Sequence, residues 1–232
     1  MYYNVIKNTN EVAFHSLTVV LFFFWLLGRE KFLAQIASGP IAIACVTVVV
    51  IVFNIFGEWG FHKYILHRVS MTMFRNWPYP FRWLYGINIS FWDAHHNRHH
   101  PLTPPSRYAI MEEGQAVSSH FPPWTYFALV GAYLPFLLLV QWVAGAGVPI
   151  LLGGIAGVFF SYYAYEFLHT LYHTPYWSFW EKKIATPGWR GAFWKWWHDY
   201  HEDHHKDTNK NFNIVFPLAD FFLGTMAKSK AV

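Results

Sequence analysis

The sequence predicts an all-α integral membrane protein, with about four transmembrane helices and a cytoplasmic helical cap that carries a polyhistidine dinuclear metal site. Two observations lead to this expectation. The composition is 54% hydrophobic and only 13% charged, whereas soluble domains contain about 25% charged residues. Most of the 14 histidines fall into four short clusters, and the neutral imidazole is the commonest metal ligand in proteins. The length of 232 residues fits a single membrane-embedded domain, 1–232.

Four apolar stretches are long enough to cross a bilayer, which takes about 20 residues in a helix. They lie near residues 12–27, 40–56, 124–143 and 148–168. The first stretch lacks a basic leader and a small-residue cleavage site, so we expect it to be a retained span and not a signal peptide. The intervening and final segments, 57–123 and 169–232, then form the cap.

The basic residues predict the orientation, because lysine and arginine accumulate in cytoplasmic loops. Arg29 and Lys31 lie between the first two spans, and the turn around Gly145 and Gly147 has no basic residue. The rest of the 17 basic residues lie before the first span, between the second and third, or after the fourth. We therefore expect both termini and all four histidine clusters on the cytoplasmic side, in the endoplasmic reticulum or a bacterial inner membrane.

The histidine clusters repeat one layout in the two halves of the chain. Each half has two spans, a histidine pair where the second span ends, and then a His-x-x-His-His run. Residues three and four apart share a helical face, so each run would project three rings to one side. The predicted metal ligands, five from each half, are His62, His67, His96, His99, His100, His169, His173, His201, His204 and His205.

The first pair, His62 and His67, does not fit an ideal helix. The two residues are five positions apart, which would splay their side chains by about 140°. They would then either hold a cluster from two sides or straddle the end of a helix. The segments that join each pair to its run are rich in tryptophan, which collects at the membrane–water interface, so we expect these segments to lie along it.

The all-nitrogen ligand set limits the metal. It suits zinc, copper, iron or nickel and disfavours magnesium and calcium. A site at the cytoplasmic end of a lipid-embedded helix bundle is suited to a lipid chain, and attack on an unactivated C–H bond needs a redox-active metal. Zinc is redox-inert, but it binds nitrogen ligands more tightly than ferrous iron does. Zinc can therefore replace iron in the purified protein.

The motif order resembles that of the fatty acid hydroxylase and sterol desaturase superfamily of membrane-bound polyhistidine di-iron oxygenases, closest to the fatty acid 2-hydroxylases. The resemblance runs from about Glu58 to Thr225, through HKYILH, HNRHH, HTLYH and HEDHH. The family's ligands match the ten histidines given above. The tail NKNFNIVFPLADFFLGT also resembles the family, except that Asn213 stands where a glycine is common. The matching residues of the tail are Asn211, Pro217, Asp220, Gly224 and Thr225.

This resemblance implies two iron ions, dioxygen as co-substrate, and an external electron donor that is cytochrome b5-like or a ferredoxin with its reductase. Several side chains near the ligands are candidates for orienting them through hydrogen bonds. Glu166 lies three residues before His169 on the same helical face. His95 and His198 exceed the family pattern, so each of these two either orients a ligand or replaces one. The candidates are Glu166, His95, His198, Asp93 and Asn211.

The function implied is hydroxylation of a C–H bond in a long-chain lipid, with a fatty acyl chain as the preferred substrate. A carotenoid hydroxylase or a sterol or lipid desaturase of the same superfamily stays open, since these enzymes share the layout. A histidine-rich metal transporter is the alternative from another class, but it would favour ligands within the spans. The net charge of +4 is too small to indicate nucleic acid, so we expect a lipid substrate, the membrane and the electron donor as partners.

Overall fold

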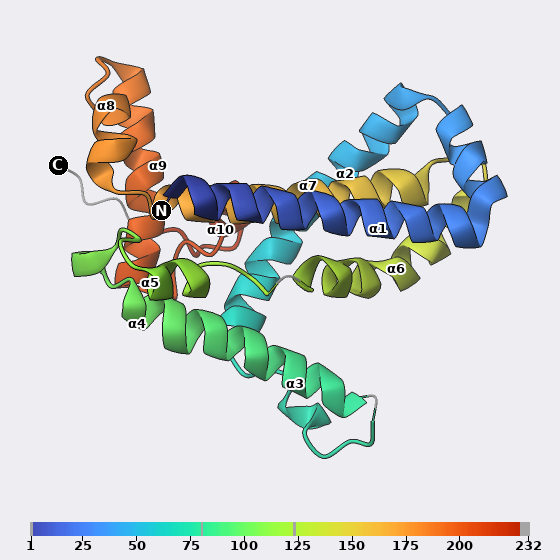
Figure 1. The fold of residues 1–232 in the computed structure, drawn as a ribbon, viewed down its shortest axis with the longest axis horizontal. Coiled ribbons are helices and arrows are strands. Elements are labelled where there is room, and N and C mark those ends of the chain that lie inside the picture. The colour runs from blue at the N-terminus through green and yellow to red at the C-terminus, as the bar shows by residue number, and fades with distance from the viewer. Residues whose placement is uncertain (1, 80, 123, 228–232) are drawn as a thin grey trace. The chain divides into compact units, whose positions relative to one another are not determined.

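The computed structural model describes residues 2–79, 81–122 and 124–227, and every regular element within them is helical (Figure 1). The chain divides into two compact units. The first, here called the apolar unit, comprises Met1–Asn54 and Pro122–Phe167. The second, here called the histidine unit, comprises Ile55–Phe121 and Leu168–Val232. Its two segments begin and end within two residues of those that the sequence assigns to the cap.

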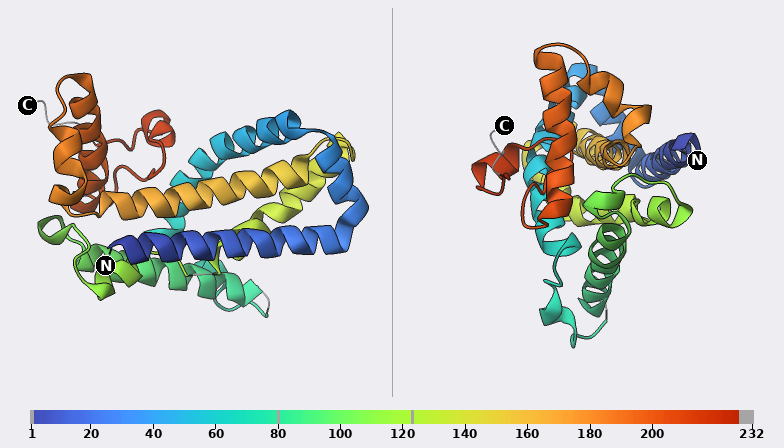
Figure 2. Two further views of the ribbon diagram at one scale, coloured as in Figure 1. Left: turned by 45° about the horizontal axis from the view of Figure 1, so that its top comes forward. Right: turned by 90° about the vertical axis from the view of Figure 1, so that its left-hand side faces the viewer.

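The apolar unit contains α1 (Tyr2–Ala37), α6 (Thr125–Ala144) and the first parts of α2 (Pro40–Phe61) and α7 (Ile150–Tyr172), which both continue into the histidine unit. The further elements of the histidine unit are η1 (His62–Leu66), η2 (Thr72–Phe74), α3 (Phe81–Trp92), η3 (Asp93–His99), α4 (His100–Leu102), η4 (Pro105–Arg107), α5 (Glu113–Ser118), η5 (Tyr176–Ser178), α8 (Trp180–Ile184), α9 (Trp189–Lys206) and α10 (Leu218–Phe222). In Figure 2, α8 folds back against α9.

Three helices are long and apolar enough to cross a membrane, which is consistent with a membrane protein. They are Pro40–Leu66, Thr125–Ala144 and Ile150–Tyr172, and they contain most of the second, third and fourth predicted spans. The first predicted span lies within α1, where the described residues give only a shorter apolar helix, Ala13–Phe22. A fourth crossing therefore stays a prediction.

Two glycines of α7 allow α2 to approach it closely in the apolar unit. A Cβ atom added at Gly153 would lie 2.6 Å from Val46 Cβ, and one added at Gly157 would lie 2.6 Å from Val50 Cβ. Small residues four positions apart permit such close packing between membrane helices. The approach also lets the hydroxyl of Thr47 donate a hydrogen bond to the carbonyl of Gly153 at 3.2 Å.

Two histidine pairs in the histidine unit close π-helical turns, in which the backbone hydrogen bond joins residues five apart. The amide of His67 donates to the carbonyl of His62 at 3.1 Å, and the amide of His100 donates to the carbonyl of His95. The rings of His62 and His67 consequently stack, with centroids 5.0 Å apart and planes 19° apart. The splay of an ideal α-helix does not apply, and both rings lie on one side at the end of α2.

A buried carboxylate organises the loop between α9 and α10. Asp220 is fully buried and accepts hydrogen bonds from the amides of Phe212 at 3.0 Å and Asn213 at 2.7 Å. It also accepts from the hydroxyls of Tyr200 and Thr225, each at 2.5 Å. Asp220 therefore fixes the backbone of this loop at Phe212 and Asn213.

Asn213 takes part in the same loop without the left-handed backbone that a glycine would favour. Its side-chain amide donates to the carbonyl of Ile55 at 2.8 Å, and its side-chain oxygen accepts from the amide of Asp220 at 3.2 Å. Among the described residues, the non-glycine with positive φ is Asn211, at 52°. An asparagine at position 213 thus supplies hydrogen bonds that a glycine could not.

We predict that Gly157→Ala lowers the stability of the apolar unit by roughly 1–3 kcal/mol, because the added methyl overlaps Val50 and packed helices tolerate such overlap poorly. Gly131→Ala in α6 is the matched control, since a Cβ there would meet no atom within 4 Å. Thermal unfolding of both variants in detergent measures the difference. Equal melting temperatures for the two variants would contradict the close packing of α2 on α7.

Candidate metal centre

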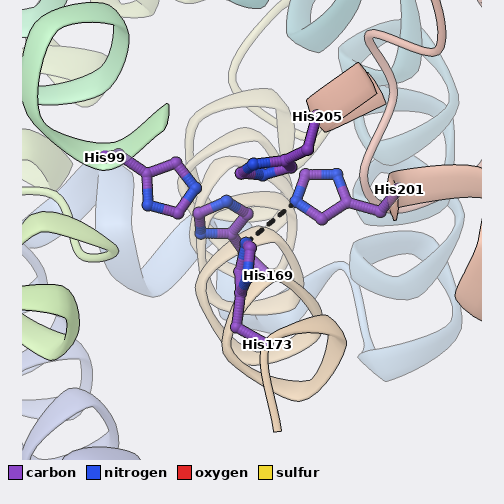
Figure 3. A group of neighbouring side chains, drawn as sticks. All are labelled: His99, His169, His173, His201 and His205. Carbon is purple, nitrogen blue, oxygen red and sulfur yellow. Dashed lines mark hydrogen bonds between the residues drawn. The ribbon is translucent and has the colours of Figure 1, made fainter. Parts of the chain in front are cut away.

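Five buried histidines of the histidine unit converge on one point. This first group consists of His99, His169, His173, His201 and His205, and one ligand nitrogen from each lies within 4.8 Å of all the others. Figure 3 shows the five rings facing one another, with the Nε2 atoms of His173 and His201 in contact at 3.2 Å. The rings come from η3, the end of α7, the segment that follows it, and α9, so segments distant in the sequence build one site.

Backbone carbonyls fix the orientation of most of these rings. The Nδ1 atoms lie within hydrogen-bond distance of carbonyl oxygens in three cases: His173 with Tyr108 at 2.7 Å, His205 with Thr103 at 2.8 Å, and His169 with Ser119 at 2.9 Å. A carbonyl can only accept a hydrogen bond, so Nδ1 carries the hydrogen in each ring and Nε2 carries the lone pair. This is how metal-binding histidines are usually held.

His99 is held by a side chain with the same result. The hydroxyl of Ser119 donates to the carbonyl of Gln115 at 2.8 Å, so its oxygen accepts from Nδ1 of His99 at 3.1 Å. The Nε2 atoms of His99 and His205 are buried without a hydrogen-bond partner. An unsatisfied buried acceptor costs about 1–3 kcal/mol, and a metal ion would satisfy both lone pairs. The five residues therefore fit a metal ion.

Burial keeps the rings in the form that binds metal. Removal from water lowers the pKa of His173 to about 3 and that of His204 to about 4. Burial, followed by repulsion from neighbouring imidazoles, also lowers the pKa of His99 and His205 well below the usual value. These rings are neutral at neutral pH, and neutral imidazole is the metal ligand.

A second group of histidines lies in the same unit. It consists of His62, His67, His95 and His204, whose ligand nitrogens again lie within 4.8 Å of one another. Nε2 of His62 is 3.0 Å from Nε2 of His95, and Nε2 of His67 is 3.1 Å from Nε2 of His204. Two imidazoles bound to one ion at 2.0–2.1 Å would have their nitrogens about 3.0–3.4 Å apart. The second group thus also has the spacing of a metal site.

The loop fixed by Asp220 supports the second group. Nδ1 of His62 donates to the carbonyl of Phe212, and Nδ1 of His204 donates to the carbonyl of Lys210 at 2.7 Å. Both carbonyls belong to this loop, so Asp220 acts indirectly on two rings of the second group. The sequence predicts a role for the tail only through its resemblance to the family; the carbonyls themselves have no sequence signal.

The two halves of the chain contribute unequal numbers of histidines to each group. The first group takes His99 from the first half and four histidines from the second, whereas the second group takes only His204 from the second half. Two of the ten predicted ligands lie in neither group. His100 has its Nε2 3.2 Å from Nε2 of His95, and His96 has its Nδ1 3.1 Å from Nδ1 of His67.

The candidates for orienting ligands are dispersed. Glu166 is buried in α7 within the apolar unit. Asp93 forms an ion pair with Arg98 that is largely solvent-accessible, and Asn211 holds the backbone of the C-terminal loop by donating to the carbonyl of Tyr200 at 2.8 Å. His198 lies 3.2 Å from Asp199 and, with Asp199 and Glu202, forms a separate half-buried cluster on α9.

Comparisons with protein-family models, curated proteins and solved structures found no match to this chain. The chemistry of the centre is therefore inferred from its own residues and their order in the chain.

We predict that His205→Ala lowers the metal content by about one ion per chain, because it removes a buried ligand of the first group. His198→Ala is the matched control: it lies on the same helix, seven residues earlier, and belongs to neither group of converging rings. Elemental analysis of the purified variants gives the metal content. An equal loss of metal in the His198 variant would contradict the assignment.

Proposed function

We propose that the protein is a membrane-bound di-iron oxygenase that uses dioxygen to hydroxylate a C–H bond of a long-chain lipid, with a fatty acyl chain as the preferred substrate. The observation that carries the proposal is the buried first group of five neutral histidines, next to which the second group offers a site for another ion. The motif order adds support, because it resembles that of the fatty acid hydroxylase and sterol desaturase superfamily.

The donor set favours a redox centre over a hydrolytic one. When bound, two iron ions supply the one-electron and oxygen chemistry that an unactivated C–H bond requires. The chain holds the imidazoles neutral, fixes the Nδ1 hydrogens of His169, His173 and His205 on carbonyls, and excludes water by burial. Five nitrogen donors in one group exceed the three protein ligands of the usual catalytic zinc site. Zinc would fit the same nitrogens without supporting the reaction.

The place of two histidines in the sequence, at the ends of apolar helices, supports a lipid substrate. His62 directly follows α2, and His169 lies in the last turn of α7; both helices are long and apolar enough to span a bilayer. A lipid whose head group stays at the interface could therefore bring a C–H bond of its chain to the level of the metals. The distribution of the basic residues favours a site on the cytoplasmic side. The proposal also includes four spans, from the apolar stretches, and an external electron donor, which the resemblance implies.

The test is oxygenation by the full-length protein loaded with iron, supplied with a reductant, ¹⁸O₂ and a mixed membrane-lipid extract. We expect a lipid product that gains one ¹⁸O atom, with no product from zinc-loaded protein or from His205→Ala. Mass spectrometry also separates a desaturase, whose product loses two hydrogens without gaining oxygen. Metal flux into vesicles without oxygen consumption would overturn the proposal in favour of a transporter.

A further inference from the structure

The run HHNRHH contains two adjacent histidines, His95 and His96. A helix can direct only one of them toward the metal centre. In an α-helix His96 shares a face with His99 and His100, which are three and four residues further on. The segment Asp93–His99 is instead π-helical, and a π turn aligns residues five apart. His95 therefore lies on the same helical face as His100, where α-helical spacing would place His96.

The ring contacts agree with this change of face. The centroid of His95 lies 4.8 Å from that of His100 and 5.2 Å from that of His99. The centroid of His96 lies 6.4 Å from that of His100, and its ring stacks on Trp92 at 6.0 Å with the planes 19° apart. His95 is 5% exposed, whereas His96 is only half-buried.

The nitrogen contacts of His95 are those of a ligand. Its Nε2 lies 3.0 Å from Nε2 of His62 and 3.2 Å from Nε2 of His100. Nδ1 of His62 donates to the carbonyl of Phe212, so Nε2 of His62 carries a lone pair that faces His95. A cation between these nitrogens would satisfy the lone pairs that the structure brings together.

His96 contacts the ring of His67 on the side that faces away from His204. Its Nδ1 meets Nδ1 of His67 at 3.1 Å, while Nε2 of His67 faces Nε2 of His204 at 3.1 Å. The Nδ1 atoms of His62 and His204 contact backbone carbonyls in the same manner. His96 thus has the position that a carbonyl has behind the other rings of the second group.

We infer that His95 and His96 exchange the roles that α-helical spacing gives them. His95 binds the ion of the second group through Nε2, and His96 is a positioning residue that accepts the Nδ1 hydrogen of His67. The inference rests on the proposed two-ion centre. It assigns to this ion His62 and His67, which one π turn joins, and His95, which begins the other π turn.

The test is a zinc titration of the full-length protein and of the variants His95→Ala and His96→Ala, with zinc bound per chain measured against a competing chelator. We expect two zinc ions per wild-type chain. Loss of a residue that orients a ligand costs about 10–100-fold in metal affinity, so His96→Ala should weaken the second ion by that factor. His95→Ala should weaken it by more than about 100-fold, and neither variant should alter binding of the first ion.

A larger loss in His96→Ala, equal losses in the two variants, or a single zinc per wild-type chain would overturn the inference. Unchanged binding of the first ion reports that the histidine unit is folded. If His95→Ala does not fold, anomalous scattering from zinc in the wild-type protein decides: Nε2 of His95 should lie about 2.0–2.1 Å from an ion, and a bond from His96 in its place would overturn the exchange. Failure of lipid oxygenation would leave these zinc results unchanged, so the two proposals fail separately.

Discussion

The centre depends on one constraint: buried imidazoles must stay neutral and turn the same nitrogen inward. Burial lowers the pKa of rings such as His173 and His204, which prevents their protonation at neutral pH. Hydrogen bonds from Nδ1 to carbonyl oxygens then leave the Nε2 lone pairs inside the cluster. Without a cation the buried Nε2 lone pairs of His99 and His205 lack a hydrogen-bond partner. The arrangement is therefore most readily explained as a site for metal ions.

Irregular backbone segments of the surrounding fold bring these rings together and orient them. Two π turns bring His62 beside His67 and His95 beside His100, which a regular α-helix would separate. The C-terminal loop supplies two of the orienting carbonyls, and the buried carboxylate of Asp220 holds that loop by accepting four hydrogen bonds. A site of this kind needs acceptors at fixed positions, and irregular segments provide the carbonyls that regular helices use internally.

Much of the site could be predicted from the sequence, because histidine spacing and long apolar stretches are local signals. The gathering of four distant clusters into one unit follows from their common position at and beyond the ends of the apolar helices. The choice between His95 and His96 could not be predicted, because α-helical spacing favours His96 and the sequence has no signal for the π-helical backbone of Asp93–His99. The carbonyls of Tyr108 and Thr103 were also unpredictable, because every residue has a carbonyl and only the fold determines which ones face a ring.

The prediction of spans depends on length and composition alone. Three helices are long and apolar enough to cross a bilayer. The first predicted stretch, 12–27, lies within α1, and its crossing stays a prediction.

The central claim is that neutral histidines alone provide the protein ligands of the centre. X-ray absorption at the zinc edge of the zinc-loaded protein is the decisive measurement, because sulfur ligands have longer bonds and the ring carbons of histidine give their own outer-shell signals. We expect nitrogen neighbours at about 2.0–2.1 Å with the outer-shell carbon signals of imidazole rings. Sulfur neighbours near 2.3 Å, or a shell without imidazole carbons, would contradict it.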